Sequence, residues 1–366
     1  MRPSISAGEP IYLRVNRTDD DWTISYSYNG ISWVVLNSFN VPLAISAISG
    51  EELSRRGAVD TMELGSVAPN VNVSSENQRD SVFITIRGVT GTDIRNEADP
   101  TTAFHVDGAY VTRLSGAGAY FFDLDRVEVL RGPQGTLFGR NTPAGVVKFD
   151  TVKPSQDLDA YVKLSYGTYD TTDIQAAVGG PLGGNWSGRF SALYQSRSDW
   201  VDNEYEAGPE RGLGAYDTTA FRGQLLWEPN EDFSALLNLH GWDVDGTARI
   251  FRANIFVPGT NNLVDDFHQD VVYHDGRNKQ EISSFGGVLK LEYDFGAATL
   301  TSVTGYESID DMYSRGDIDG GFGADFLGPG NSGPGPIAFA SESADGIPYL
   351  DQWTQEIRIA SNSGGD

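Results

Sequence analysis

The chain has 366 residues, enough for two or three domains and a well-buried core. Its 51 acidic residues against 26 lysines and arginines give a formal net charge of −25. This balance excludes the clustered positive charge that a nucleic-acid-binding protein needs, so no nucleic-acid partner is expected. Cysteine is absent, which excludes disulfides and thiol chemistry. The 43 glycines, 18 phenylalanines, 16 tyrosines and 7 tryptophans favour turn-rich β structure.

Residues 1–40 predict a β-hairpin segment. Two short segments, 11–15 and 22–28, alternate polar and apolar side chains on either side of an acidic turn. The pattern LRVNRT…DWTISYSYNGISW resembles one edge of the concanavalin- and laminin-G-like β-sandwich modules found beside secreted glycan-active proteins. Two or three strands are too few for an independent sandwich. The pattern is consistent both with an incidental hairpin and with a fragment of a glycan-binding module.

Residues 41–153 have a different character. Ser49, followed three residues later by Glu52, suits the capping box of a short helix with an apolar side. A strand is expected at 82–86, ending at Arg87 and Gly88, and another at 104–111, interrupted by an Asp-Gly turn. The apolar side of the helical region consists of Leu53, Val59 and Leu64.

The stretch 122–149, FDLDRVEVLRGPQGTLFGRNTPAGVVKF, organises this part of the chain. A short apolar strand runs into a sharp Arg-Gly-Pro turn and a segment punctuated by glycine, where the backbone must bend repeatedly. The run resembles the plug-domain signature of TonB-dependent outer-membrane receptors, and the elements at 41–64, 82–88 and 104–111 resemble the other plug landmarks in the same order. The positions that carry the signature are Gly88, Asp107, Gly108, Glu128, Gly132, Pro133, Gly135, Gly139, Arg140 and Asn141.

Strands with alternating side chains follow from residue 157 onward. In the segment 160–166, for example, Val162 and Leu164 alternate with Tyr161 and Lys163. One polar and one apolar face, repeated hairpin after hairpin, is typical of transmembrane β-barrels. Further strands with this pattern are expected at 172–178, 189–195 and 221–228, and near 232–244, 281–295, 297–309 and 350–361.

The connections between these strands alternate in length, as short periplasmic turns and long extracellular loops do. Short links are expected at 181–185, 229–232 and near 296, and long ones at 200–215, 245–280 and 310–349. About eight strands are expected, whereas plugged outer-membrane transporters have about 22. The predicted fold class is therefore a mixed α/β plug domain at 41–153, then an incomplete antiparallel β-barrel at 154–366, after the β-hairpin segment at 1–40.

The resemblance implies a function in energised import across the outer membrane of a Gram-negative bacterium. The partners it implies are the TonB-ExbB-ExbD complex, outer-membrane lipid and a scarce small-molecule ligand. A ferric siderophore is the commonest cargo of the family, with cobalamin, heme and oligosaccharides as alternatives. Arg87 and Arg131 match plug arginines that, in the family, pair with glutamates of later barrel strands. The plug-loop positions that would contact the ligand are Asp93, Ile94, Arg95, Ser115 and Gly116.

Two features of the sequence resemble metal-binding patterns, but neither predicts a metal site. Residues 320–328 fit the calcium nonapeptide of stacked repeats, but the pattern occurs once. His268 and His274 lie among aspartates in a long loop, a pattern that a solvated acidic loop explains better than a zinc or iron site. No metal and no cofactor are expected. No G-x-S-x-G, H-E-x-x-H or P-loop is present, so no catalytic residue is assigned and the chain is not expected to be an enzyme.

Three functional hypotheses remain. The first is a TonB-dependent receptor fragment that binds and imports its ligand, although no signal peptide or TonB box is seen before Val41. The second is a carbohydrate-binding module fused to a plug domain. The third is a truncated binding protein that does not transport.

Overall fold

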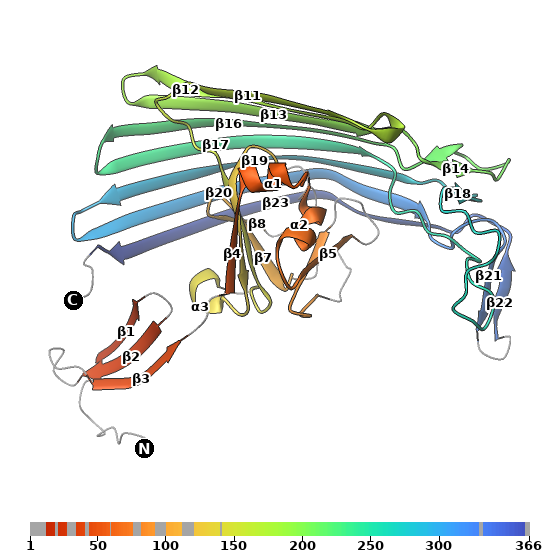
Figure 1. Cartoon of the computed structure of the whole chain (residues 1–366), viewed down its shortest axis with the longest axis horizontal. Coiled ribbons are helices and arrows are strands. Elements are labelled where there is room, and N and C mark those ends of the chain that lie inside the picture. Colours follow the sequence, from red (N-terminus) through yellow and green to blue (C-terminus); the bar gives the residue numbers. More distant parts are fainter. Residues whose placement is uncertain are drawn as a thin grey trace.

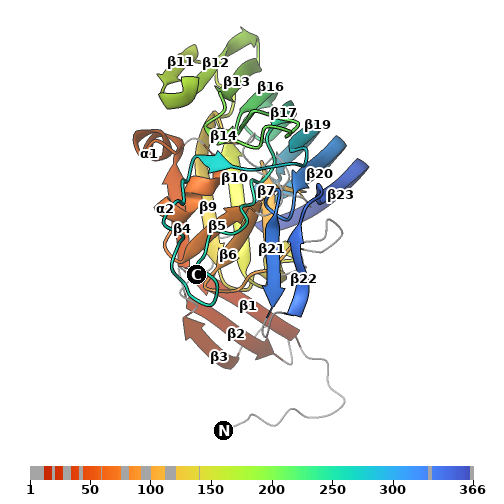
Figure 2. The ribbon, with the colours of Figure 1, turned by 90° about the vertical axis from the view of Figure 1, so that its right-hand side faces the viewer.

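The computed structural model describes residues 12–18, 21–27, 34–40, 44–58, 60–75, 82–91, 100–111, 121–139, 141–328 and 332–362. Most of them lie in strands, and the two largest sheets face one another (Figures 1 and 2). We call the five-stranded sheet the inner sheet and the eight-stranded sheet the outer sheet. The outer sheet curves around the inner one, as the view along its strands shows (Figure 2).

The N-terminal strands form a separate antiparallel sheet. The strands are β1 (Tyr12–Thr18), β2 (Asp21–Ser27) and β3 (Val34–Asn40). Leu13 of β1 lies opposite Tyr26 of β2, so the two alternating segments do pair as a hairpin. The likeness to glycan-binding modules stays a prediction.

The inner sheet has the strand order β4-β9-β10-β7-β8. Its strands are β4 (Ala44–Ser49), β7 (Thr102–Val106), β8 (Ala109–Val111), β9 (Leu124–Arg131) and β10 (Gly145–Thr151). The pair β10 and β7 is parallel and the other pairs are antiparallel. A second hairpin, β5 (Val71–Ser75) with β6 (Val82–Ile86), and the short helices α1 (Gly50–Arg55), η1 (Thr61–Glu63), α2 (Leu64–Val67) and α3 (Gly135–Phe138) complete this unit.

The inner unit buries β-branched and aromatic side chains on both faces of its sheet, and every residue of β7 is buried. Val127 and Val147 are fully buried, and the rings of Phe104 and Phe149 stack with their centroids 6.2 Å apart. Leu53 of α1 and Leu64 of α2 join this core, as the sequence predicts, whereas Val59 lies outside the described residues.

The start of α1 differs from its prediction. The Ser49 hydroxyl accepts the Glu52 backbone N–H at 3.2 Å, which is half of the expected capping box. The Glu52 carboxylate pairs with Arg55 and Arg56 on the next turn. A reciprocal box forms instead at Asp60, whose backbone N–H donates to the Glu63 carboxylate at 2.8 Å. Two nearby arginines attract Glu52 forward along the helix, away from the cap.

The outer sheet is antiparallel, and its strands follow one another in sequence order. Alternate side chains are inverted relative to a soluble sheet: apolar ones point outward and polar ones inward. Val162, Phe190 and Ile357 are 68%, 54% and 69% exposed, while Arg189 and Gln224 are buried. The strands are β11 (Asp159–Tyr166), β12 (Thr172–Gly183), β13 (Trp186–Arg197), β16 (Tyr216–Asn230), β17 (Phe233–Gly246), β19 (Lys279–Asp294), β20 (Ala298–Asp317) and β23 (Glu342–Ser361).

From β12 onward the connections alternate between short ones at one end of the outer sheet and long ones at the other, as predicted (Figure 1). The links β12–β13, β16–β17 and β19–β20 are short and lie at one end, and the long connections lie at the other. The long connections contain the short strands β14 (Val201–Asn203), β15 (Gly212–Leu213), β18 (Val271–Val272), β21 (Ala324–Gly328) and β22 (Ser332–Ile337). A one-turn 3₁₀ helix, η3 (Thr168–Asp170), joins β11 to β12.

No helix among the described residues is long and apolar enough to cross a membrane.

Two glycines of the inner sheet are needed for different reasons. Gly108 adopts φ 90° after Asp107 at φ 49°, a pair of left-handed residues that forms a two-residue turn between β7 and β8. At Gly145 an added Cβ would lie 2.2 Å from the Leu130 carbonyl oxygen.

We expect Gly108→Ala to lower the free energy of unfolding by about 1 kcal/mol, the cost of a left-handed non-glycine residue. We expect Gly145→Ala to lower it by about 2 kcal/mol, the cost of overpacking. Urea unfolding measures both, and an unchanged Gly145→Ala variant would contradict the close approach.

Candidate functional site between the inner and outer sheets

A buried ion pair joins the two sheets. Asp123, just before β9, presents both carboxylate oxygens to the guanidinium of Arg189 on β13, at 2.6 and 2.7 Å. The side chains are 1% and 4% exposed, so the pair is shielded from water. Arg189 also donates to Asp159 at 2.7 Å, but the Asp159 side chain is 58% exposed. Two-pronged contacts of this kind fix the position and the orientation of the arginine.

A second arginine of the outer sheet reaches the same part of the chain. Arg222 on β16 is 2% exposed and donates to the backbone oxygen of Phe122 at 2.9 Å. Its guanidinium carbon lies 4.5 Å from the centre of the Phe122 ring, a cation–π distance. Thus Phe122 and Asp123 are each held by an arginine from the concave side of the outer sheet.

The Asp-Gly turn makes the other polar link. Asp107 accepts hydrogen bonds from the backbone N–H and hydroxyl of Thr151 at 2.9 and 3.0 Å. Its second oxygen accepts the Asn238 amide from β17 at 2.5 Å. Gln224 of β16 donates to the Thr151 hydroxyl at 2.5 Å, so two strands of the outer sheet reach one turn of the inner sheet.

This link continues along the inner wall of the outer sheet. The Asn238 amide oxygen lies 3.2 Å from Nδ1 of His240, and Nε2 of His240 lies 2.8 Å from the Glu307 carboxylate on β20. All three side chains are buried. A chain of polar side chains therefore connects Asp107 to a strand two places further along the sheet. Such a network is stable only while every member has its partner.

Apolar contact between the sheets is extensive. The main core of the inner unit continues into buried side chains of the outer sheet, among them Leu193, Trp242 and Ile282. A smaller contact lies at β8. Ala109 of β8 packs against Val288 and Val303 in one small cluster. Beside it, Gln352 of β23 donates to the Tyr110 backbone oxygen at 2.8 Å. The described interface thus combines an apolar core shared by the two sheets with oriented polar bonds, and the polar bonds can exchange with water when two surfaces separate.

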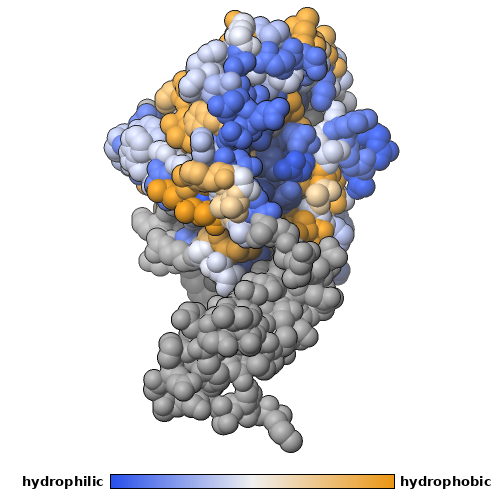
Figure 3. Space-filling model, turned by 90° about the vertical axis from the view of Figure 1, so that its left-hand side faces the viewer, coloured by the Kyte–Doolittle hydropathy of each residue, from blue (hydrophilic) through white to orange (hydrophobic). Residues whose placement is uncertain are grey.

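A cleft of about 570 Å³ lies beside the Asp107 turn. It is lined by charges of both signs from the two sheets, including Arg126, Lys148 and Asp150 of the inner sheet and Lys290 and Glu356 of the outer sheet. Figure 3 faces the end with the short connections and shows a hollowed hydrophilic region bordered by hydrophobic residues. Its lining suits water and polar solutes better than apolar ones.

Most of the predicted signature residues form turns, helix ends or polar contacts within the inner unit. Gly132, at φ 101°, and Pro133 begin the turn after β9, and the Gly132 N–H donates to the Ala144 oxygen at 2.8 Å. Gly135 begins α3, and Gly139 and Asn141 end it with positive φ. The Asn141 amide donates to the Tyr110 hydroxyl at 3.0 Å, and Glu128 pairs with Lys148 at 2.7 Å. Gly88 follows β6 with φ 79°, and Arg140 lies outside the described residues.

The other predicted site residues are placed as follows. Arg131 donates to the Pro69 backbone oxygen at 2.9 Å, within the inner unit. Arg87 is exposed beside Gly132. The proposed pairing of both with later barrel strands stays a prediction. The five expected ligand contacts, Asp93, Ile94, Arg95, Ser115 and Gly116, lie outside the described residues.

The sequence analysis missed the residues that join the sheets. Asp123, Arg189, Arg222 and Asn238 were not singled out. Arg189 and Arg222 stand on the polar side of alternating strands, next to Phe190 and Phe221 on the other side, and this is the one signal that identifies them. The sequence also does not say that the arginines belong to the outer sheet and the acceptors to the inner unit.

Comparison with known proteins supports the resemblance of the chain to TonB-dependent receptors. Residues 37–146 match the family model of the TonB-dependent receptor plug domain. The chain is 27% identical over 202 residues to the ferripyoverdine receptor of Pseudomonas aeruginosa, covering 54% of this chain and 23% of that protein. It is 30% identical over 139 residues to the pesticin receptor of Yersinia enterocolitica, covering 37% and 20%. The chain thus spans about a quarter or less of these relatives.

Solved structures show the same fold. The ferric yersiniabactin uptake receptor FyuA of Yersinia pestis superposes with a TM-score of 0.71 at 17% identity, covering 88% of this chain and 46% of that one. The ferric-catecholate import receptor Fiu of Escherichia coli, in its open form, gives a TM-score of 0.66 at 15% identity, covering 88% and 46%.

Proposed function

We propose that this chain, which belongs to the TonB-dependent receptors, acts in the outer membrane as part of a receptor that binds a ferric siderophore and imports it. The chain is accordingly a transporter component and not an enzyme. In this proposal residues 41–153 are the plug, residues 154–366 are the first part of the barrel and residues 1–40 are an appended β segment. The cargo class follows relatives named for ferripyoverdine and ferrioxamine.

The outward face of the outer sheet supports membrane insertion. Its exposed side chains are apolar over successive strands, as a lipid-facing surface requires. Aromatic rings form a row at the end with the short connections: Trp186 stacks on Trp227 at 5.5 Å, and Phe233, Tyr293 and Phe295 continue it. Aromatic side chains favour the boundary between lipid and water. The row would mark the periplasmic edge of the membrane.

The observation that carries the import proposal is the set of polar bonds that joins the inner unit to the outer sheet beside their shared apolar core. A plug that seals a barrel must be held firmly and must also release when energy is supplied. Hydrogen bonds and ion pairs have strict geometry, so a small displacement of the plug breaks them and lets water replace them. In this proposal the TonB-ExbB-ExbD complex supplies that displacement, as the family resemblance implies.

The ligand would approach from the end with the long connections and meet the plug loops. Asp93, Ile94, Arg95, Ser115 and Gly116 remain our candidates for its contacts. Arg95 suits an anionic siderophore because its guanidinium can pair with carboxylate or phenolate oxygens. Arg87 and Arg131 remain candidates for holding the plug against barrel strands.

Uptake of iron tests the proposal. We expect the full protein, produced in a Gram-negative host that lacks its own siderophore receptors, to import radioactive iron from at least one ferric siderophore in a panel of catecholates, hydroxamates and mixed chelators. Import should stop when the tonB gene is deleted, while binding to the cell surface should persist. Import that continues without TonB, or binding of glycans with no siderophore bound, would contradict the proposal.

An arginine of the plug loops supplies a sharper test. Arg95→Ala is expected to weaken binding of an anionic ferric siderophore by about 10- to 100-fold, the effect of losing one hydrogen bond to a charged group. The matched control is Arg55→Ala on α1, where the side chain is 70% exposed and pairs with Glu52. The control should bind as the unaltered protein does. Equal affinity of both variants would remove Arg95 from the site.

A further inference from the structure

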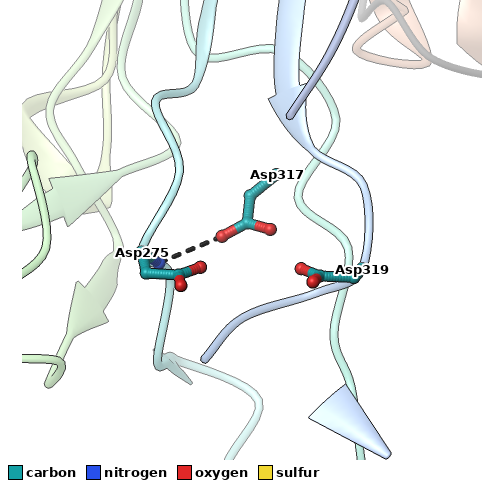
Figure 4. A group of neighbouring side chains, drawn as sticks. All are labelled: Asp275, Asp317 and Asp319. Atoms are coloured by element: carbon teal, nitrogen blue, oxygen red, sulfur yellow. Dashed lines mark hydrogen bonds between the residues drawn. The ribbon is translucent and has the colours of Figure 1, made fainter. Parts of the chain in front are cut away.

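Three aspartates converge at the end of the outer sheet that carries the long connections. Asp275 lies in the connection between β17 and β19, Asp317 ends β20, and Asp319 follows two residues later. One carboxylate oxygen of each lies within 4.8 Å of one oxygen of each of the others. Figure 4 shows the three carboxylates turned toward a common centre. This cluster is separate from the interface between plug and wall.

Two members of the cluster are deeply buried and only half satisfied. Asp317 is 0% exposed and Asp319 is 7% exposed. One oxygen of Asp317 accepts the backbone N–H groups of Asp275 and Gly276, both at 3.0 Å. One oxygen of Asp319 accepts the Gly321 N–H at 3.3 Å. The remaining oxygen of each, together with Oδ1 of Asp275, is buried without a hydrogen-bond partner in the described part of the chain.

Such an arrangement needs positive charge at its centre. An ionised carboxylate can only accept hydrogen bonds, so three of them cannot satisfy one another. No lysine or arginine in the described ranges forms an ion pair with these aspartates, and the nearby Arg315 is paired with Glu342. Burial, followed by the adjacent Asp317 carboxylate, raises the pKa of Asp319 to about 7. Either a shared proton or a bound cation must relieve the repulsion.

We propose that Asp275, Asp317 and Asp319 bind a divalent cation, Ca²⁺ in preference to Mg²⁺. Carboxylate oxygens are the ligands that both ions prefer. Calcium binds its ligands at 2.3–2.6 Å, so two ligands on one ion can be about 5 Å apart, whereas the shorter bonds of magnesium allow about 4 Å. The three oxygens lie within 4.8 Å of one another, a limit that the bond lengths of calcium accommodate in full. Magnesium usually binds through only one or two carboxylates and keeps several waters, so three converging carboxylates favour calcium. Water and backbone carbonyls would supply the remaining ligands.

The cation would join two connections that are distant in sequence. Asp275 belongs to the connection after β17, and Asp319 begins the one after β20. Their bridge would hold the two against each other on the face where the ligand of the proposed receptor arrives. The site itself requires nothing of the import proposal, because it could bind calcium in a protein of any function.

Thermal unfolding with and without calcium tests the site. The purified full protein in detergent micelles is stripped with EGTA and titrated with CaCl₂. We expect a dissociation constant of about 10⁻⁴ to 10⁻³ M, the range of extracellular modules. The unfolding midpoint should rise by about 2 °C or more at ten times that concentration. MgCl₂ should give a smaller rise, and no rise with calcium would overturn the proposal in favour of a shared proton.

Charge-removing variants separate a metal site from a structural cluster. Asp319→Asn should weaken calcium binding at least tenfold, and in EGTA its midpoint should equal or exceed that of the unaltered protein because one repelling charge is gone. Asp265→Asn, an exposed aspartate of the same long connection, should leave both values unchanged. Asp275→Asn, at a less buried position, replaces Asp319→Asn if that variant does not fold. Calcium binding that survives both changes would overturn the assignment.

Discussion

The Asp123→Asn variant is expected to lose about 3 kcal/mol of unfolding free energy, the low end of the cost of breaking a buried ion pair. Asparagine tolerates the left-handed backbone that Asp123 adopts at φ 50°, so the change isolates the charge. Arg189 would keep Asp159 as its partner, but that carboxylate is largely in water. Urea unfolding in detergent micelles, followed by tryptophan fluorescence, measures the loss.

Two further variants test whether burial determines this loss of unfolding free energy. Asp159→Ala removes the exposed partner of the same arginine and should cost under about 1 kcal/mol, as exposed pairs do. The double variant Asp123→Asn with Arg189→Met should be more stable than Asp123→Asn alone, since no buried charge then lacks its buried partner and Asp159 is left in water. If Asp159→Ala proved as costly as Asp123→Asn, the buried contact would not be the one that joins the sheets.

The Asp107→Ala variant should also lose about 3 kcal/mol. It removes the acceptor for the Thr151 N–H and for the Asn238 amide, and both groups stay buried. Hydrogen bonds to charged groups contribute about 1.5–3 kcal/mol, and alanine at φ 49° adds about 1 kcal/mol of backbone strain. The same urea titration measures the loss.

An exchange of the two side chains tests whether the effect arises between the sheets. Asp107→Asn alone sets one amide against the Asn238 amide, so that two donors face each other. Adding Asn238→Asp restores a donor and an acceptor, and we expect the double variant to regain more than half of the stability that Asp107→Asn loses. Additive losses in the two single variants would show that Asp107 acts within the inner sheet alone.

The sequence predicted the local features of the outer sheet well. Alternation such as that of Val162 with Tyr161 has a period of two, which is set by the pleat of the strand itself. Short and long connections follow from where that alternation stops. The Asp107–Gly108 turn could be predicted for the same reason, because the need for left-handed backbone is a property of two adjacent residues.

The contacts between the sheets could not be predicted in this way. Asp123 and Arg189 are 66 positions apart, and Asp107 and Asn238 are 131 apart. Nothing in a local pattern selects one of 51 acidic residues for one arginine. The family resemblance directed attention to Arg87 and Arg131 of the inner unit. The described bonds between the sheets come instead from donors of the outer sheet, namely Arg189, Arg222, Gln224, Asn238 and Gln352.

The aspartate cluster shows the division between sequence and tertiary structure most plainly. The sequence drew attention to His268 and His274 among loop aspartates and, separately, to the glycine-rich run at 320–328, and neither predicted a metal. The antiparallel pairing of β19 with β20 brings the end of one connection beside the start of the next. By itself the sequence determined strand periodicity, turn residues and the plug signature, since these depend on neighbours along the chain. The tertiary structure decided which charges meet and are buried, because pairing energies depend on distance and on exclusion of water.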